Sequence, residues 1–106
     1  MVRLSKKQAK ESEESFKAMK ELISKEEVDL KNEKLFNDSK KNLATEVVET
    51  RKTLGLNQYH LAELSGKSQG AIARLETMKS NPTLKGISEI AGAMNKKVNI
   101  VFEDIE

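Results

Sequence analysis

The sequence of 106 residues predicts an all-α protein whose centre is a pair of short helices, residues 57–76, joined by a tight turn. Three observations support this fold class. Apolar residues recur at helical spacing from residue 42 to residue 95. Asn, Ser or Thr precedes three of these apolar segments as a helix cap. Glycine follows two of them, where a left-handed residue ends a helix. We expect an N-terminal helical arm (1–41), a helical domain (42–95) and a C-terminal strand with an acidic tail (96–106).

The composition argues against several classes of function. The sequence contains no cysteine, so it has no disulfide, thiolate metal site or cysteine nucleophile. Its single histidine, His60, cannot form a metal cluster by itself, and no nucleophile-elbow or phosphate-binding glycine motif is present. We therefore expect no enzyme: no catalytic residues, no metal and no cofactor.

Membrane segments and secretion signals are also missing from the sequence. No apolar run approaches the roughly 20 residues that cross a membrane. The basic N-terminal residues are not followed by the apolar stretch of a secretory signal. We expect a cytoplasmic protein with no membrane contact.

The net charge is only +2, but its distribution is uneven. Residues 42–101 contain 8 basic and 5 acidic side chains, a net charge of +3, whereas the last five residues contain three acids and no base. A moderately basic middle is compatible with nucleic-acid binding and does not by itself indicate it.

The arm carries a narrow apolar stripe on a highly charged segment. Ser5 and Gln8 form a capping-box pattern, which predicts a helix that begins at Ser5. A break is expected at residues 37–42, with Asp38 or Ser39 as the cap of the next helix. The stripe either packs on the chain's own domain or fits the groove of another protein. The candidate partner-binding residues are Phe16, Met19, Leu22, Ile23, Leu35 and Phe36.

Four helices are expected in residues 42–95. The first ends at Gly55, and the second begins after a cap at Asn57. The third is capped by Ser68. The last begins at Thr83, after a turn that contains the only proline, and ends near Asn95.

The period of the apolar residues changes near the C-terminus. Val98, Ile100 and Phe102 alternate with other residues, as in a strand. A strand needs a hydrogen-bonded partner, which is either a second copy in a two-stranded ribbon or the chain's own helices. We favour the ribbon across a dimer axis. The predicted dimer-interface residues are Val98, Ile100, Val101 and Phe102.

The helix pair at residues 57–76 meets the requirements of a helix-turn-helix. Such a motif needs apolar anchors between the helices and a left-handed residue in the turn, here Gly66. The anchors are Leu61, Ala62, Ile72 and Leu75. The second helix leaves four residues facing outward, namely Gln69, Gly70, Ala73 and Arg74. Glutamine can recognise adenine and arginine guanine in the major groove, each by two hydrogen bonds.

Residues 43–94 resemble the phage-repressor-type (Xre/Cro/C1) helix-turn-helix family, a five-helix DNA-binding domain. The resemblance is carried by Gln58, Leu61, Ala62, Gly66, Ser68, Gln69, Ile72, Leu75, Glu76 and Pro82. It implies base contacts from Gln69, Gly70 and Arg74, and we add Ala73 as the fourth outward-facing residue of the same helix. It implies a structural role for Glu76. It also implies phosphate contacts from Gln58, Ser68, Ala71, Thr77 and Lys79. Because they are positively charged, Lys67 and Lys85 are expected to contact phosphates as well.

The sequence departs from the family pattern at four positions. Lys67 replaces an apolar residue, and Leu64 is apolar where a polar residue is common. Gly70 replaces a side chain that often contacts a base, so fewer direct base contacts are expected. Met78 stands where the family often has glycine, so we expect a different loop after the recognition helix.

The C-terminal segment and the arm are similar to those of small antitoxins of the HigA and HipB type. This resemblance implies a type II antitoxin that binds a cognate toxin, with a RelE-superfamily mRNA interferase as the candidate class. It also implies repression of its own operon by a homodimer on palindromic operator DNA. Two alternatives stay open: a phage or plasmid repressor without a toxin, and a protein-interaction module that keeps the helix-turn-helix as a scaffold.

Overall fold

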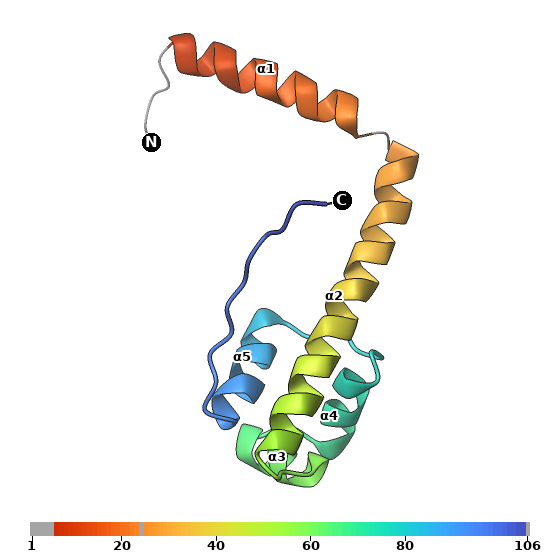
Figure 1. Ribbon diagram of the computed structural model, residues 1–106, viewed down its shortest axis with the longest axis vertical. Helices are drawn as coiled ribbons and strands as arrows, with labels where there is room; N and C mark the ends of the chain where they lie inside the picture. Colours follow the sequence, from red (N-terminus) through yellow and green to blue (C-terminus); the bar gives the residue numbers. More distant parts are fainter. Residues whose placement is uncertain (1–5, 24, 106) are drawn as a thin grey trace. The chain divides into compact units, whose positions relative to one another are not determined.

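The computed structural model describes residues 6–23 and 25–105, with side chains described for residues 10–23 and 29–105. This part of the chain contains five α-helices and no strand, which confirms the all-α class (Figure 1). No helix within it is long and apolar enough to span a bilayer. The helices are α1 (Lys6–Leu22), α2 (Lys25–Thr53), α3 (Gln58–Ser65), α4 (Gln69–Glu76) and α5 (Leu84–Ala93). The expected helix start at Ser5 lies outside the described residues.

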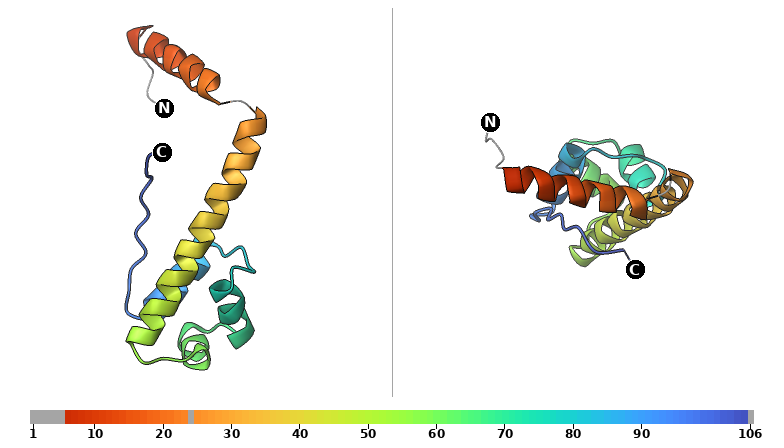
Figure 2. Two further views of the ribbon diagram at one scale, coloured as in Figure 1. Left: turned by 45° about the vertical axis from the view of Figure 1, so that its right-hand side comes forward. Right: turned by 90° about the horizontal axis from the view of Figure 1, so that it is seen from above.

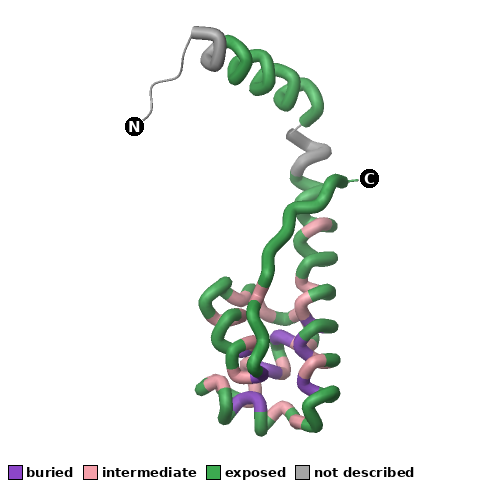
Figure 3. Tube along the Cα trace, turned by 60° about the vertical axis from the view of Figure 1, so that its left-hand side comes forward, coloured by how far each residue is buried: buried purple, intermediate pink, exposed green. Residues whose placement is uncertain are grey.

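The chain divides into an N-terminal unit, residues 1–36, and a C-terminal unit, residues 37–106. None of the described side chains of the N-terminal unit is buried. Among the side chains that the structure describes, all of the buried ones lie in the C-terminal unit, where they form the purple segments of Figure 3. The predicted three-part division at residues 41 and 95 stays a prediction.

A single apolar core holds the C-terminal unit together. Helix α3 packs against both α4 and α5. Leu61 of α3 and Ile72 of α4 are completely buried, and burial of such a side chain contributes roughly 1.5–3 kcal/mol. The cluster consists of Val47, Leu61, Ala62, Ile72, Leu75, Ile90 and Met94. All four predicted anchors of the helix pair belong to it.

Each of the three short helices begins at the predicted cap. Ser68 accepts a hydrogen bond from the Ala71 amide, and Thr83 accepts one from the Gly86 amide, both at 3.0 Å. Asn57 accepts one from the His60 amide at 2.7 Å. These caps each add about 1 kcal/mol to the stability of their helix.

His60 completes the cap of α3. Its Nδ1 accepts a hydrogen bond of 3.1 Å from the Asn57 amide, so the two residues form a reciprocal capping box. The His60 side chain is exposed, and its ring has this local structural role.

The turns between the helices use left-handed residues. Gly66, at the end of α3, has a φ of 69°, as predicted for the turn of the helix pair. Met78, just after α4, has a φ of 64°, in a region that side chains other than glycine rarely adopt. Met78 therefore adopts a backbone conformation that glycine takes up more readily, and the expectation of a loop that differs from the family's stays a prediction.

The expected break at residues 37–42 is wrong. Helix α2 runs without interruption from Lys25 to Thr53, so neither Asp38 nor Ser39 caps a new helix. The segment contains no glycine or proline, and extension of an existing helix adds one hydrogen bond per residue at little further entropic cost. A cap preference worth about 1 kcal/mol does not end such a helix. Residues 42–95 accordingly contain the end of α2 and three further helices.

The expected C-terminal strand is also absent, because the described residues 96–105 form no helix or strand. Val98 is half-buried, and Ile100, Val101 and Phe102 are exposed. A strand is defined by hydrogen bonds to a neighbouring strand, and the described part of this chain supplies none. Alternating apolar residues were therefore an insufficient signal, and the structure does not support the dimer ribbon.

A buried ion pair joins α2 to α4. Arg51 donates from Nε and Nη2 to the two carboxylate oxygens of Glu76, at 2.9 and 2.8 Å. Its Nη1 donates to the carbonyl oxygen of Leu56 at 2.9 Å. The two side chains are only 10% and 5% exposed. The pair confirms a structural role for Glu76, and removal of either partner would leave a buried charge without its counter-ion.

The pKa values of both groups reflect this contact. Burial by itself raises the pKa of Glu76, but hydrogen bonds from Arg51 and Gln58 and the charges of Arg51 and Lys52 outweigh it. Together they hold the pKa below its ordinary value of 4.5. The hydrogen bond to Glu76 raises the pKa of Arg51, against the effect of burial. Both groups are therefore charged at neutral pH.

Glu76→Gln should lower the free energy of unfolding at neutral pH by about 1.5–3 kcal/mol, the range for a hydrogen bond between charged groups. Because the pKa of Glu76 is lowered in the folded chain, its contribution is complete above pH 4.5 and is lost as the pH falls through the lowered pKa. Urea unfolding of both proteins from neutral pH to about pH 3 measures this. The stability difference should shrink on acidification, and a constant difference would contradict the assignment.

Candidate nucleic-acid interface

Helix α4 has a buried face and an exposed face. Ile72 and Leu75 are buried against the core, whereas Gln69, Gly70 and Ala73 are partly exposed and Arg74 is exposed. The four predicted base-contacting residues therefore lie together on the surface of one helix. Their contacts with DNA stay predictions.

Helix α3 holds α4 in a defined orientation. The two helices lie side by side in both views of Figure 2, joined by residues 66–68. The turn is closed by amide hydrogen bonds, from Gly66 to Glu63 and from Lys67 to Ala62. Core packing on one side and this turn on the other fix the direction in which the N-terminal end of α4 points. That end is the part that enters the major groove in a helix-turn-helix.

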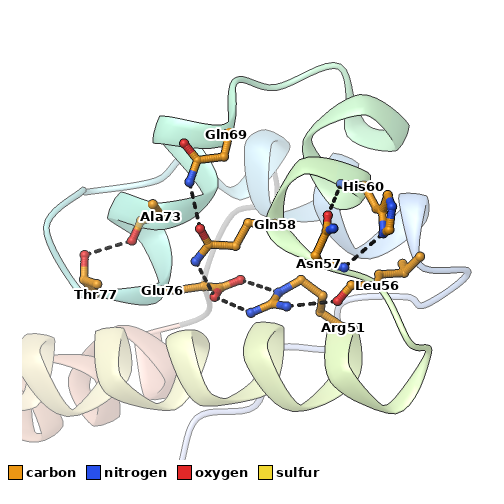
Figure 4. Close-up of polar contacts among 9 residues, drawn as sticks. All are labelled: Arg51, Leu56, Asn57, Gln58, His60, Gln69, Ala73, Glu76 and Thr77. Atoms are coloured by element: carbon orange, nitrogen blue, oxygen red, sulfur yellow. Dashed lines mark hydrogen bonds and ion pairs between the residues drawn. The ribbon is translucent and has the colours of Figure 1, made fainter.

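A chain of hydrogen bonds leads from the buried ion pair to the exposed face of α4 (Figure 4). Gln58, the first residue of α3, donates from Nε2 to Oε1 of Glu76 at 3.0 Å. Gln69, the first residue of α4, donates from Nε2 to Oε1 of Gln58 at 2.8 Å. We call Arg51, Glu76, Gln58 and Gln69 the orienting chain.

The hydrogen bonds of the orienting chain can be donated in only one direction, from Gln69 to Gln58 and from Gln58 to Glu76. An ionised carboxylate only accepts hydrogen bonds, so Gln58 must turn its NH₂ group toward Glu76. The carbonyl oxygen of Gln58 then faces Gln69, which must donate as well. This leaves one N–H and the carbonyl oxygen of Gln69 available at the surface. One donor and one acceptor are the set that a glutamine needs for two hydrogen bonds to adenine.

The predicted phosphate-contacting residues differ in how far they are already engaged. Lys67 is paired with Glu89 of α5 at 3.2 Å, on the surface. The hydroxyl of Ser68 caps α4, and that of Thr77 donates to the carbonyl oxygen of Ala73 at 2.8 Å. Ala71 offers only its backbone, whose amide bonds to Ser68.

Three exposed cations lie on α4, on the loop after it and on α5. The side chains of Arg74, Lys79 and Lys85 are exposed and, within the part of the chain that the structure describes, make no hydrogen bond or ion pair. Among the described residues, no group of acidic, histidine or cysteine side chains is arranged to hold a metal ion. The surface around α4 is therefore suited to a polyanion.

The candidate toxin-binding residues lie in the N-terminal unit, on α1, directly after it and on α2. Phe16, Met19 and Leu22 of α1 are 61%, 54% and 75% exposed. Ile23 and Phe36 are also exposed, and Leu35 is half-buried. The ammonium group of Lys20 lies 5.1 Å from the centre of the Phe16 ring, a cation–π contact. Large apolar side chains thus lie open to solvent on a charged helix.

Comparison with known proteins identifies the C-terminal unit. Residues 47–101, more than half of the chain, match the helix-turn-helix family model HTH_3. An "uncharacterized HTH-type transcriptional regulator" from Haemophilus influenzae is 36% identical over 59 residues, which are 56% of this chain and 60% of that protein. The chain thus spans less than two thirds of the length of this relative.

A solved structure extends the similarity over more of the chain. A "Toxin-Antitoxin module from Streptococcus pneumoniae" is similar with a TM-score of 0.55 and 33% sequence identity. The similarity covers 84% of this chain and 92% of that one. Together with the anchors, turn and caps of α3 and α4, these matches show that the chain belongs to the Xre/Cro-type helix-turn-helix family.

Proposed function

We propose that this protein is a type II antitoxin of the HigA/HipB type, which represses its own operon and neutralises a cognate toxin in the cytoplasm. The observation that carries the DNA-binding part is the orienting chain, which ends in a surface glutamine with one free donor and one free acceptor. The antitoxin part is supported by the similarity to a toxin–antitoxin module and by the exposed apolar residues of α1.

The DNA-binding mechanism follows from the geometry of α4. Its N-terminal end enters the major groove, where Gln69 recognises adenine and Arg74 recognises guanine. Lys79, Lys85, Gln58 and the backbone at the start of α4 contact phosphates and supply most of the salt-dependent affinity. Two copies bind as a homodimer to a palindromic operator, with recognition helices about 34 Å apart.

The toxin-binding mechanism uses the N-terminal unit. An amphipathic helix binds a partner by placing its apolar side chains in a groove. Phe16 and Met19 of α1 and Ile23, the residue directly after it, recur at spacings of three and four. The partner class we propose is a small mRNA interferase of the RelE superfamily. Binding would bury the side chains that are now open to solvent.

A repressor without a toxin is the alternative function. The relative from Haemophilus influenzae is described only as a transcriptional regulator, and its similarity covers 56% of this chain. In this alternative, α1 has a role that does not involve a toxin.

Arg74→Ala should weaken binding to the preferred operator by about 1–3 kcal/mol and relax the sequence preference, because it removes a base contact. Lys79→Ala should weaken binding to all duplexes alike and reduce the dependence on salt, because it removes a phosphate contact. The preferred sequence is first enriched from a randomised duplex pool, and fluorescence anisotropy at several salt concentrations then gives the affinities. If both variants lose affinity equally on every sequence, Arg74 contacts phosphate or has only a structural role.

Replacing Phe16 and Met19 by alanine in the full chain should lower affinity for the protein encoded beside this gene by tenfold or more, since buried aromatic anchors dominate such interfaces. Lys17→Ala with Glu21→Ala, on the same helix, is the matched control and should have a small effect. Isothermal titration with the purified neighbouring protein measures both. Operator binding should be unchanged in each variant. Equal affinity of the alanine variant and the wild-type chain would refute the assignment of α1.

A further inference from the structure

Gly70 is an unusual residue for its place. It lies in the first turn of α4, within the four-residue exposed face. Glycine destabilises a helix interior relative to alanine, because it loses more conformational freedom on folding. Its φ is not in the left-handed region, so the backbone conformation does not require glycine here. The residue therefore needs another explanation.

The guanidinium group of Arg74 supplies one. A Cβ atom built at Gly70 would lie 3.3 Å from Nη1 of Arg74, closer than an ordinary van der Waals contact, and 4.0 Å from Oγ of Ser68. The Arg74 side chain thus lies back along α4, against the bare Cα of the residue one turn earlier. Long helical side chains lean toward the N-terminus of their helix, which is the direction seen here.

The position of this guanidinium matters because its donors are free. Arg74 is exposed, and its side chain makes no hydrogen bond or ion pair within the part of the chain that the structure describes. All five of its N–H groups remain available. Its terminal nitrogen lies over the first turn of α4, the turn that also begins with Gln69.

We propose that Gly70 is a specificity-determining residue that acts by positioning Arg74. Because glycine has no Cβ, the guanidinium lies over the first turn of α4 and meets the same short stretch of base edges as Gln69. The expected loss of a base contact at Gly70 is thereby compensated, since the arginine occupies the space that a larger side chain would fill. This inference rests on the proposed sequence-specific DNA binding.

The fold itself tolerates a Cβ at this position. The nearest atom is the free end of a flexible side chain, which can swing away at little cost. Gly92, near the end of α5, provides a matched control because nothing lies within 4 Å of the Cβ that alanine would add there. Both substitutions replace a helical glycine by alanine, but only the one at Gly70 displaces Arg74.

The test compares the wild-type protein with Gly70→Ala, Arg74→Ala, the double variant and Gly92→Ala. The probes are the duplex that the wild-type protein enriches from a randomised pool and a scrambled duplex of equal length. The measured quantity is the ratio of the two affinities. Thermal unfolding of each variant checks the fold.

Arg74→Ala should lower the affinity ratio about tenfold, because it removes one bidentate base contact. Gly70→Ala should lower the ratio by a smaller but measurable factor, about threefold or more, because the added Cβ only displaces the guanidinium. In the Arg74→Ala background, Gly70→Ala should change the ratio less than about twofold, since positioning of a missing side chain has no effect. Gly92→Ala should leave the ratio unchanged. The melting temperature of Gly70→Ala should not fall below that of the wild-type protein.

Four outcomes would overturn the inference. If Gly70→Ala keeps the wild-type affinity ratio, the glycine does not act through the arginine. The same conclusion follows if Gly70→Ala lowers the affinity ratio equally in the wild-type and Arg74→Ala backgrounds. Equal weakening on both duplexes shows that the added methyl group crowds the DNA backbone instead. Failure of the wild-type protein to enrich any sequence overturns the proposed DNA-binding function itself, and this inference with it.

Discussion

The ion pair between Arg51 and Glu76 is the interaction on which the surface of α4 depends. It joins the end of α2 to the end of α4 in a site with little solvent exposure, where a carboxylate without its partner is destabilising. The ionised Glu76 then determines which way the amide of Gln58 faces, and Gln58 determines the same for Gln69. A buried charge thereby fixes the orientation of a surface side chain whose own rotamers would otherwise be free.

Apolar packing and polar orientation have separate tasks in this unit. The completely buried Leu61 and Ile72 set the relative position of α3 and α4, but such contacts are non-directional and leave surface side chains unspecified. The orienting chain and the contact between Arg74 and Gly70 supply the direction. A recognition surface needs both, because a displacement of the helix or a rotated amide each removes a bidentate contact with a base.

Local signals were sufficient to predict most of the C-terminal unit. The caps at Asn57, Ser68 and Thr83 and the anchors of the helix pair follow from residue type and spacing, and the structure has them all. The capping role of His60 could have been predicted from its position three residues after Asn57, which is the spacing of a capping box. It was missed because a capping box usually has Glu or Gln at that position. Arg51 had no local signal, because its partner lies 25 residues away. The predicted helix break was wrong because a cap preference is weaker than the gain from extending an existing helix. The predicted strand was wrong because alternating apolar residues do not form a strand without a second strand to pair with.

Ionised Glu76 orients the amide of Gln69, and the base discrimination of a Glu76→Gln variant tests this most directly. The base pair at which Gln69→Ala has its largest effect on affinity is identified first. The measurement is then the ratio of affinities for two duplexes that differ only at this base pair, with adenine in one and guanine in the other. A glutamine at position 76 can donate as well as accept, so the amides of Gln58 and Gln69 are no longer held in one direction. We predict that Glu76→Gln loses about tenfold of the preference for adenine, as Gln69→Ala does, under conditions where both variants are folded. Wild-type discrimination in a less stable Glu76→Gln protein would contradict the account and reduce the ion pair to a purely structural role.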